Sequence, residues 1–408
     1  MLTQMNQGFA LSPQQTRIWQ LEALRGSPVF IARCRVEAKG PLDVGLFEQA
    51  IMDVGAAHEI LRTKFDVLTG TDLPVQTVGN DAVLKVESEG RELVITLPAL
   101  CADSAALLRL LADLAAAYQA RLNGWKYQAA PSQYKDHSAW KNKAGGDAPD
   151  WASGAAPLAT GLGQTATADP RSFTPARVMR RLDDLLSARL DELAKVHDAL
   201  VSEVLLACWY LMLARLLPLN DITVFQSVAA KHEAALQGAL GPFEEWRAVT
   251  IPVSDDTTLA DVVSRLRAAD VMGAVETSPA RVCFSYAEAP ANDSFRVIDA
   301  FAYTDQFVVK LACLLTGSDI SVGVEFDSSC VSRKAAEILL ERFESVLRDG
   351  RWAGIGAVER ETILEHSTGA AMEKQLGKPV HRFFEEQARI YPQKTAVRCG
   401  DQSLTYAH

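Results

Sequence analysis

Apolar and polar residues alternate along the chain with two different periods, one typical of helices and one typical of strands. Apolar residues spaced three and four positions apart predict helices over residues 11–23, 44–58, 104–122, 182–197, 200–217, 259–274 and 332–348. Strict alternation or short apolar runs predict strands over residues 29–37, 60–65, 82–97, 222–228, 248–252, 282–286, 307–316 and 320–326. Because both halves of the chain mix the two kinds of element, the pattern predicts an α+β fold.

The pattern is interrupted between residues 123 and 175, where Gly, Pro, Ala, Ser and Thr become abundant and apolar periodicity is weak. We interpret this stretch as the boundary between two stacked lobes. The expected organisation is an N-terminal lobe, a C-terminal lobe, a linker and the truncated start of another domain, at residues 1–150, 151–352, 353–379 and 380–408.

The last segment has a pattern of its own, with a helix, Pro392, a strand, a turn at Gly400 and Asp401, and a second strand. A strand pair of this size is not stable alone. The segment is therefore expected to belong to a domain that continues beyond the sequence.

Composition and charge narrow the classes of partner. The 408 residues are 48% hydrophobic and 23% charged, which suits a globular protein with a sizeable core. The formal net charge of −10 is spread without a basic run, so no surface is predicted to neutralise the phosphates of a nucleic acid.

Cysteine usage and hydropathy predict a cytoplasmic protein. The seven cysteines are scattered without a CxxC pair, which indicates reduced thiols and neither a disulfide framework nor a metal site. Residues 1–11 lack the basic and apolar regions of a secretory signal. The apolar stretch at residues 199–217 contains Glu203 and Arg215, which favours a buried helix over a membrane span.

Four segments carry recognisable motifs in a fixed order: LSPQQTRIWQLE from Leu11, AHEILRTKF from Ala57, YKDHSAW from Tyr134, and ITVFQSVAAKHE followed by LGPF from Ile222. Together they resemble the condensation domains of nonribosomal peptide synthetases. This resemblance covers nearly the whole chain, and it implies two chloramphenicol-acetyltransferase-like lobes that form a V-shaped pseudo-dimer with a central tunnel.

The resemblance also implies the partners. Condensation domains act on substrates carried by the phosphopantetheine arms of peptidyl or acyl carrier proteins and bind no cofactor themselves. The tail HRFFEEQARIYPQKTAVRCGDQSLTYAH resembles the first residues of an adenylation domain. An adjoining adenylation domain is therefore the expected neighbour.

The segment that matches the family's catalytic motif departs from it. Family members carry His-His-x-x-x-Asp-Gly, whose second histidine orients or deprotonates the acceptor amine. The matching segment here is PALCADS, in which Pro98 and Ala99 replace both histidines, Asp103 remains and Ser104 takes the place of glycine. Alanine accepts no proton, so ordinary peptide condensation is expected to be very slow, although Pro98 to Asp103 are still expected to line the tunnel.

Asp103 has two interpretations at this stage. In the structural one it caps the helix that begins at Ser104 or forms an ion pair with Arg62, as the resemblance implies; in the other it is a catalytic carboxylate. The structural interpretation is favoured, because no second acid lies nearby in the sequence. Cys101 has apolar neighbours and no basic activator, so we expect a buried or tunnel-lining thiol instead of a nucleophile.

Three further residues are candidates for the tunnel or an interface. His58 lies in the second motif and is expected to form a hydrogen bond within its lobe. Phe243 and Trp246 belong to the segment FEEW, where the family typically has Phe-x-Asn. This segment has two interpretations: a surface turn without a function of its own, or a functional segment that modifies the tunnel wall or contacts a partner.

Two functions remain open from the sequence. The first is an atypical condensation-like domain that is inactive in peptide-bond formation and acts as a scaffold for carrier-bound intermediates, the adenylation domain or a tailoring enzyme. The second is an acyltransferase that forms an amide between carrier thioesters by substrate positioning alone. A free-standing acetyltransferase that uses coenzyme A is disfavoured by the adenylation-like tail and the absent histidine.

Overall fold

The computed structural model divides the polypeptide into two units, residues 1–358 and 359–408. The structure describes residues 8–25, 28–68, 70–128, 132–143, 170–217, 219–229, 238–254, 256–269, 282–350, 358, 360, 361, 363, 364, 380–399 and 402–407. Helices and strands occur in both units, so the predicted α+β class is confirmed.

The first group of elements in unit 1 is built on an antiparallel four-stranded sheet. Its strand order is β11-β2-β6-β5, with bounds Phe295–Ala302, Ile31–Ala38, Glu92–Pro98 and Lys85–Glu89. Alternate residues of β2 are buried, as the period of two predicts. The buried face packs against α2 (Val44–Ala57) and α3 (Ser104–Leu122), whose apolar residues belong to the same core.

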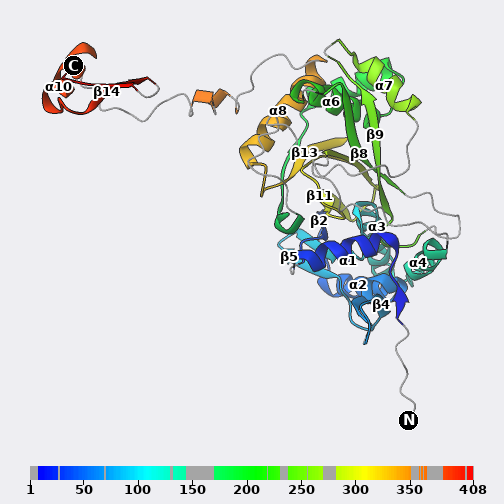
Figure 1. Cartoon of the computed structure of the whole chain (residues 1–408). Helices are drawn as coiled ribbons and strands as arrows, with labels where there is room; N and C mark the ends of the chain where they lie inside the picture. Colours follow the sequence, from blue (N-terminus) through cyan, green and yellow to red (C-terminus); the bar gives the residue numbers. More distant parts are fainter. Residues whose placement is uncertain are drawn as a thin grey trace. The chain divides into compact units, whose positions relative to one another are not determined.

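Smaller elements complete this group (Figure 1). A three-stranded sheet has the order β1-β4-β3, with bounds Phe9–Ala10, Pro74–Val78 and Thr63–Val67. The remaining elements are α1, η1 and α4, at Pro13–Arg25, Glu59–Arg62 and Tyr134–Lys143. Helix α4 lies inside the stretch expected to be a lobe boundary, and residues 144–169 of that stretch are outside the described residues.

The second group is built on a six-stranded sheet. Its strand order is β7-β13-β12-β10-β8-β9, with bounds Pro175–Arg181, Asp319–Asp327, Val309–Thr316, Val282–Ala289, Asp221–Ala229 and Glu244–Pro252. Strand β10 is parallel to both of its neighbours, and the other pairs are antiparallel. A second core joins the sheet to α5, α6, α7 and α8, at Asp184–Val196, Val201–Leu216, Leu259–Ala268 and Arg333–Asp349.

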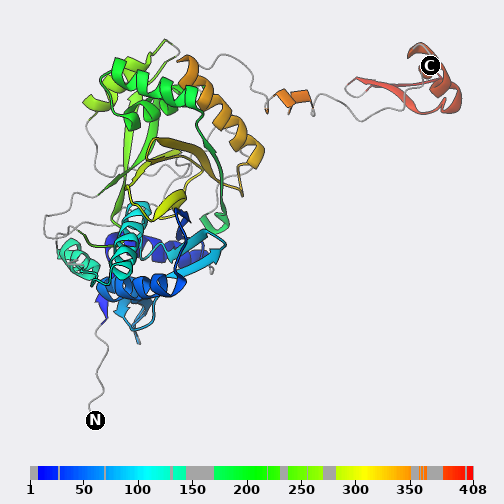
Figure 2. The ribbon, with the colours of Figure 1, turned by 180° about the vertical axis from the view of Figure 1, so that it is seen from behind.

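Strand β11 links the two groups. It follows β10 in the chain, yet it pairs with β2 along most of its length, from Phe295 opposite Ala38 to Ala302 opposite Ala32. Figures 1 and 2 show it between the six-stranded sheet and β2. The expected N-terminal lobe, residues 1–150, therefore includes in its sheet a strand from the expected C-terminal lobe, which the sequence analysis did not predict.

A second link is the segment that leads into β9. The Tyr134 hydroxyl donates to the carbonyl of Pro242 at 2.8 Å and is 2.8 Å from the Ser12 hydroxyl. The ring of Tyr134 lies directly over Gly241, so close that a Cβ atom on this residue would overlap it. The motifs that contain Ser12, Tyr134 and Gly241 thus meet in space.

Unit 2 contains the predicted helix and two strands. Helix α10 spans Val380–Ile390, and β14 (Thr395–Cys399) pairs antiparallel with β15 (Gln402–Thr405). The expected turn residues, Gly400 and Asp401, lie outside the described residues.

Within the described residues, no single helix has the length and apolar composition needed to cross a membrane. Helices α5 and α6 pass that test only as a pair, and they are bent by 100° relative to each other.

The close approach of Tyr134 to Gly241 predicts the effect of a single methyl group. Gly241→Ala should lower the free energy of unfolding by about 1–3 kcal/mol, because the Tyr134 ring must move out of a packed position. Gly55→Ala is the control: it lies in α2 with nothing within 4 Å of a new Cβ, so it should raise stability by about 0.5–1 kcal/mol. Urea unfolding of both variants measures the difference, and equal effects would contradict this packing.

Candidate functional site

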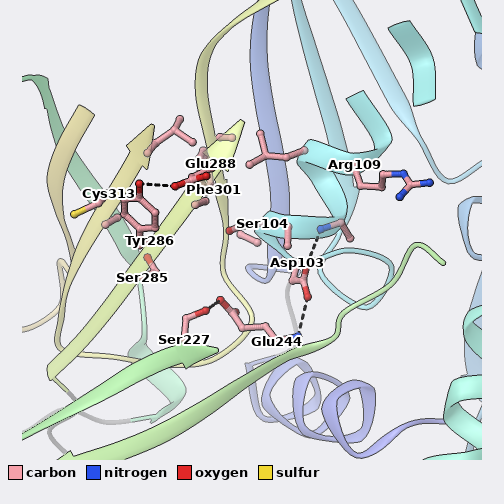
Figure 3. Close-up of a pocket in the computed structure, with 18 of the residues that line it drawn as sticks. Asp103, Ser104, Arg109, Ser227, Glu244, Ser285, Tyr286, Glu288, Phe301 and Cys313 are labelled. Atoms are coloured by element: carbon pink, nitrogen blue, oxygen red, sulfur yellow. Dashed lines mark hydrogen bonds between the residues drawn. The ribbon is translucent and has the colours of Figure 1, made fainter. Parts of the chain in front are cut away.

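A cavity of about 500 Å³ lies between the two groups of elements in unit 1. Its wall includes the first turns of α3, the adjoining ends of β8 and β9, and parts of β7, β10, β11, β12 and β13. Figure 3 shows Asp103 and Glu244 close together on this wall, with Ser227, Tyr286 and Glu288 also facing the space.

Asp103 is the point at which the catalytic-motif segment meets the second group. Its Oδ1 atom accepts a hydrogen bond from the Ala106 N–H at 2.7 Å, which caps α3. Its Oδ2 atom accepts from the N–H groups of Phe243 and Glu244, both at 2.7 Å. The structural interpretation of Asp103 as a helix cap is thus confirmed.

The alternative ion pair between Asp103 and Arg62 is wrong. Arg62 instead donates from Nε to the carbonyl of Gly55 at 3.2 Å and from Nη1 to the carbonyl of Gly79 at 3.0 Å. It contacts the end of α2 and the residue that follows β4. Backbone N–H groups take the place that a guanidinium was expected to fill beside Asp103.

The environment of Asp103 changes its acidity. Burial, and to a smaller extent the negative charge of Glu244, raise the pKa of Asp103 from its ordinary 3.8 to about 7. The three N–H donors act in the opposite direction, because each stabilises the ionised carboxylate. Asp103 therefore exchanges its proton near neutral pH.

The residues before Asp103 are buried away from the cavity. Ala99 has 0% of its surface exposed, and its N–H donates to the carbonyl of Phe30 at 3.0 Å. Of the segment expected to line the tunnel, Asp103 lines the cavity together with the following Ser104, whereas Pro98, Ala99 and Cys101 are not on its wall. These three residues are not at this cavity because the chain turns inward after β6.

Ala99 packs into an aromatic cluster formed by Phe30, Phe173, Tyr303 and Phe307. Phe30 and Phe173 stack with their ring centroids 5.8 Å apart, and Phe173 meets Phe307 edge-on at 5.2 Å. The ring centroids of Tyr303 and Phe307 lie 6.0 Å apart. The position of the family's second histidine is therefore surrounded by packed rings drawn from both groups of elements.

Cys101 is fully buried, and burial strongly raises the pKa of its thiol. A thiol in this state is a poor nucleophile. Of the two environments expected for Cys101, buried or tunnel-lining, the structure shows the buried one.

The other three candidates have different surroundings. His58 is buried, and its Nε2 lies 3.1 Å from Asp113 Oδ2 within the first group, but this atom has no hydrogen-bond partner among the described residues, so the hydrogen bond expected of His58 is not confirmed. Phe243 is buried on the cavity wall, which excludes a surface turn there. Trp246 lies over Lys310 and directs its Nε1 toward Thr304 Oγ1 at 3.4 Å.

Glu244 is the residue at the site that sequence reasoning did not single out by itself. Its carboxylate accepts hydrogen bonds from the hydroxyls of Ser227 and Thr304, on opposite oxygens. Ser227 belongs to β8, and Thr304 follows β11, so the carboxylate joins three segments that are distant in the sequence. In the segment FEEW it occupies the variable position of the family's Phe-x-Asn pattern, so the sequence contained no specific signal for it.

A buried ion-pair network forms another part of the wall. Lys310 Nζ lies 2.7 Å from Glu325 Oε2, and Arg177 pairs with Asp299 at 2.6 Å and with Glu325 at 3.5 Å. Lys310 and Glu325 are direct partners on β12 and β13. Each is a charged residue within a largely buried strand, which is the signal that could have identified them.

Among the described residues, no group of three or more His, Cys, Asp or Glu side chains is arranged to hold a metal ion.

The three bonds of Asp103 predict a large effect of its removal. Asp103→Ala should lower the free energy of unfolding by about 2–4 kcal/mol, because it removes a helix cap and leaves two buried N–H groups without an acceptor. Asp183→Ala is the control, since Asp183 caps α5 through one bond to Leu186 and should cost about 1 kcal/mol. Chemical denaturation measures both, and equal losses would contradict a link between the two groups.

The raised pKa of Asp103 predicts a pH dependence. Because the folded chain keeps this proton up to about pH 7 and the unfolded chain loses it near pH 4, the folded state binds more protons between these values. The stability that Asp103 contributes is therefore present below about pH 4 and decreases as the pH rises to about 7. Asp103→Asn does not titrate, so the unfolding free energy of the wild type minus that of this variant should decrease over this range. A difference that is constant or increases with pH would contradict the shift.

The comparisons with known sequences and with solved structures point to the same family. Residues 81–276 match the family model described as the condensation domain. The chain is 25% identical, over 97% of its length, to CymA of Salinispora arenicola, described as a probable non-canonical nonribosomal peptide synthetase, and it spans 6% of that protein.

Solved structures agree on the fold. The first condensation domain of the CDA synthetase matches with a TM-score of 0.70 at 14% identity, over 86% of this chain and 98% of that domain. The X-domain in its complex with OxyB from teicoplanin biosynthesis matches with a TM-score of 0.57 at 19% identity, over 86% of this chain and 96% of the X-domain. Residues 81–276 of the chain thus match the condensation domain family model, and the chain has the fold of solved condensation domains.

Proposed function

We propose that this condensation domain does not form peptide bonds by the family's histidine-dependent reaction and acts instead as a scaffold in a peptide synthetase. Its surfaces would receive carrier-bound intermediates, the adjoining adenylation domain or a tailoring enzyme. The observation that carries the proposal is the burial of Ala99 within the aromatic cluster, at the position of the second motif histidine.

The argument rests on what the reaction needs. Amide formation from an amine and a thioester is accelerated by a group that orients the amine and accepts its proton, which contributes roughly 10²–10⁴-fold in rate. Alanine has no such atom. Of the histidines that the structure describes in unit 1, none lies on the cavity wall.

The links between the two groups support a structural role. Arg17 of α1 donates to Asp305 at 3.1 Å, Lys141 of α4 pairs with Glu245 of β9 at 2.7 Å, and Asp103 binds the start of β9. These contacts keep the arrangement of the family fold although the catalytic pair is absent.

The comparison structures contain a related precedent. One matching fold is an X-domain that was solved in complex with a second protein, OxyB. A domain of this fold can thus present a surface to a partner protein, which supports the inclusion of a tailoring enzyme among the partners.

The first test is a single-turnover assay with donor and acceptor carrier proteins that have been loaded with aminoacyl groups. The amide should form at least about 10²-fold more slowly than with a condensation domain that has both histidines, because the proton acceptor is missing. Turnover at roughly 1 per second or faster would refute the proposal and favour catalysis by positioning.

A deletion provides the complementary test. Residues 1–350 are removed from the parent synthetase, and adenylation, carrier loading and tailoring of the loaded amino acid are measured separately. At least one of the three should slow. If all three keep their rates while amide formation alone is lost, the domain is a condensation catalyst.

A further inference from the structure

The basic side chains on the cavity wall are already neutralised. Arg177 pairs with Asp299 and Glu325, and Lys310 pairs with Glu325 at 2.7 Å. Arg109 pairs with Asp113 at 3.2 Å. None of the three therefore offers an uncompensated positive charge to a ligand.

The acids Glu244 and Glu288 have a different kind of partner. In the part of the chain that the structure describes, the Glu244 carboxylate is bound by the neutral hydroxyls of Ser227 and Thr304. Glu288 accepts from the neutral hydroxyl of Tyr286 at 2.8 Å. Because neutral donors do not cancel charge, the cavity wall keeps a negative charge after every ion pair is counted.

Glu244 is held in a fixed position. Its N–H is bound by Asp103 at 2.7 Å, and its two carboxylate oxygens each accept one hydroxyl from a different segment. A carboxylate oxygen has about two acceptor positions, so each oxygen retains one for a further donor. The carboxylate is therefore a preorganised acceptor for a cationic donor in the cavity.

The rest of the wall is largely apolar. A volume of about 500 Å³ lies within the range of small-molecule sites, which are typically lined by apolar side chains with a few polar groups that fix orientation. The apolar part of the wall includes Ala106, Leu108, Met179, Ala287, Phe301 and Leu314. This surface suits the methylene groups of a short aliphatic chain.

We propose that the cavity binds a protonated primary amine on a short aliphatic chain, with the ammonium group on the Glu244 carboxylate and the chain on the apolar wall. This inference rests on the proposed function, because it names the chemical class of carrier-bound intermediate that the scaffold receives. A carboxylate ligand is disfavoured, since it would meet a wall whose cations are neutralised.

The test uses three probes of equal chain length: hexylamine, 1-hexanol and hexanoate. Calorimetric titration of the whole chain should give a dissociation constant for hexylamine at least about 10-fold lower than for hexanol or hexanoate, because one charge-assisted hydrogen bond is worth roughly that factor. Hexanol should bind the apolar wall alone.

The variants separate the role of Glu244 from a general effect of charge. Glu244→Gln should lose most of the preference for hexylamine over hexanol and leave hexanol binding unchanged. Glu245→Gln is the matched control: the adjacent acid pairs with Lys141 and is not on the cavity wall, so the preference should remain. Circular dichroism and thermal unfolding check that each variant is folded.

Three results would overturn the inference: hexanol binding as tightly as hexylamine, hexanoate binding most tightly, or equal losses in the Gln variants of Glu244 and Glu245. If Glu244→Gln does not fold, Glu244→Asp replaces it; this variant moves the carboxylate back by one methylene group, so the preference for hexylamine should fall while Glu245→Gln retains it, and an unchanged preference in the folded Asp variant would contradict the inference. The result is independent of the condensation assay, since a domain that condenses substrates rapidly could still bind amines, and a slow one could fail to bind them.

Discussion

The carboxylate of Asp103 connects the two groups of elements at the site. One oxygen caps α3, and the other binds the N–H groups of Phe243 and Glu244 where β9 begins, so a single side chain sets the distance between the helix and the strand. The position of Glu244 depends on this connection, because its backbone N–H is one of the bound groups. The cavity wall formed by α3 and β9 therefore depends on one buried acid that loses hydration and gains three hydrogen bonds.

The sequence predicted the elements whose pattern is local. The expected helices at residues 11–23, 44–58, 104–122 and 332–348 correspond to α1, α2, α3 and α8, because each shows apolar spacing over several turns and most have a capping residue. The helix cap at Asp103 was also predictable, since an aspartate directly precedes the apolar run.

The features that were missed depend on contacts between distant residues. Strand β11 has a register shift between Val297 and Asp299, which breaks the alternation that identifies a strand. The pairing of Lys310 with Glu325 requires the register of β12 on β13, which the sequence alone does not give. The partners of Asp103 at Phe243 and Glu244 follow about 140 residues later, so no local pattern distinguishes them from Arg62 as partners.

The pairing of β11 with β2 of the first group has a consequence for how the chain folds. An ion pair between Arg296 of β11 and Glu37 of β2 joins residues that are 259 positions apart in the sequence. Strand β11 thus covers the edge of β2 through a pairing between distant parts of the chain. While the chain is being synthesised, β2 has an open edge until β11 leaves the ribosome, and open edges invite pairing with other chains. A fragment that ends before β11 would keep that edge permanently, so the first group of elements is not an independent folding unit although its residues come first in the chain.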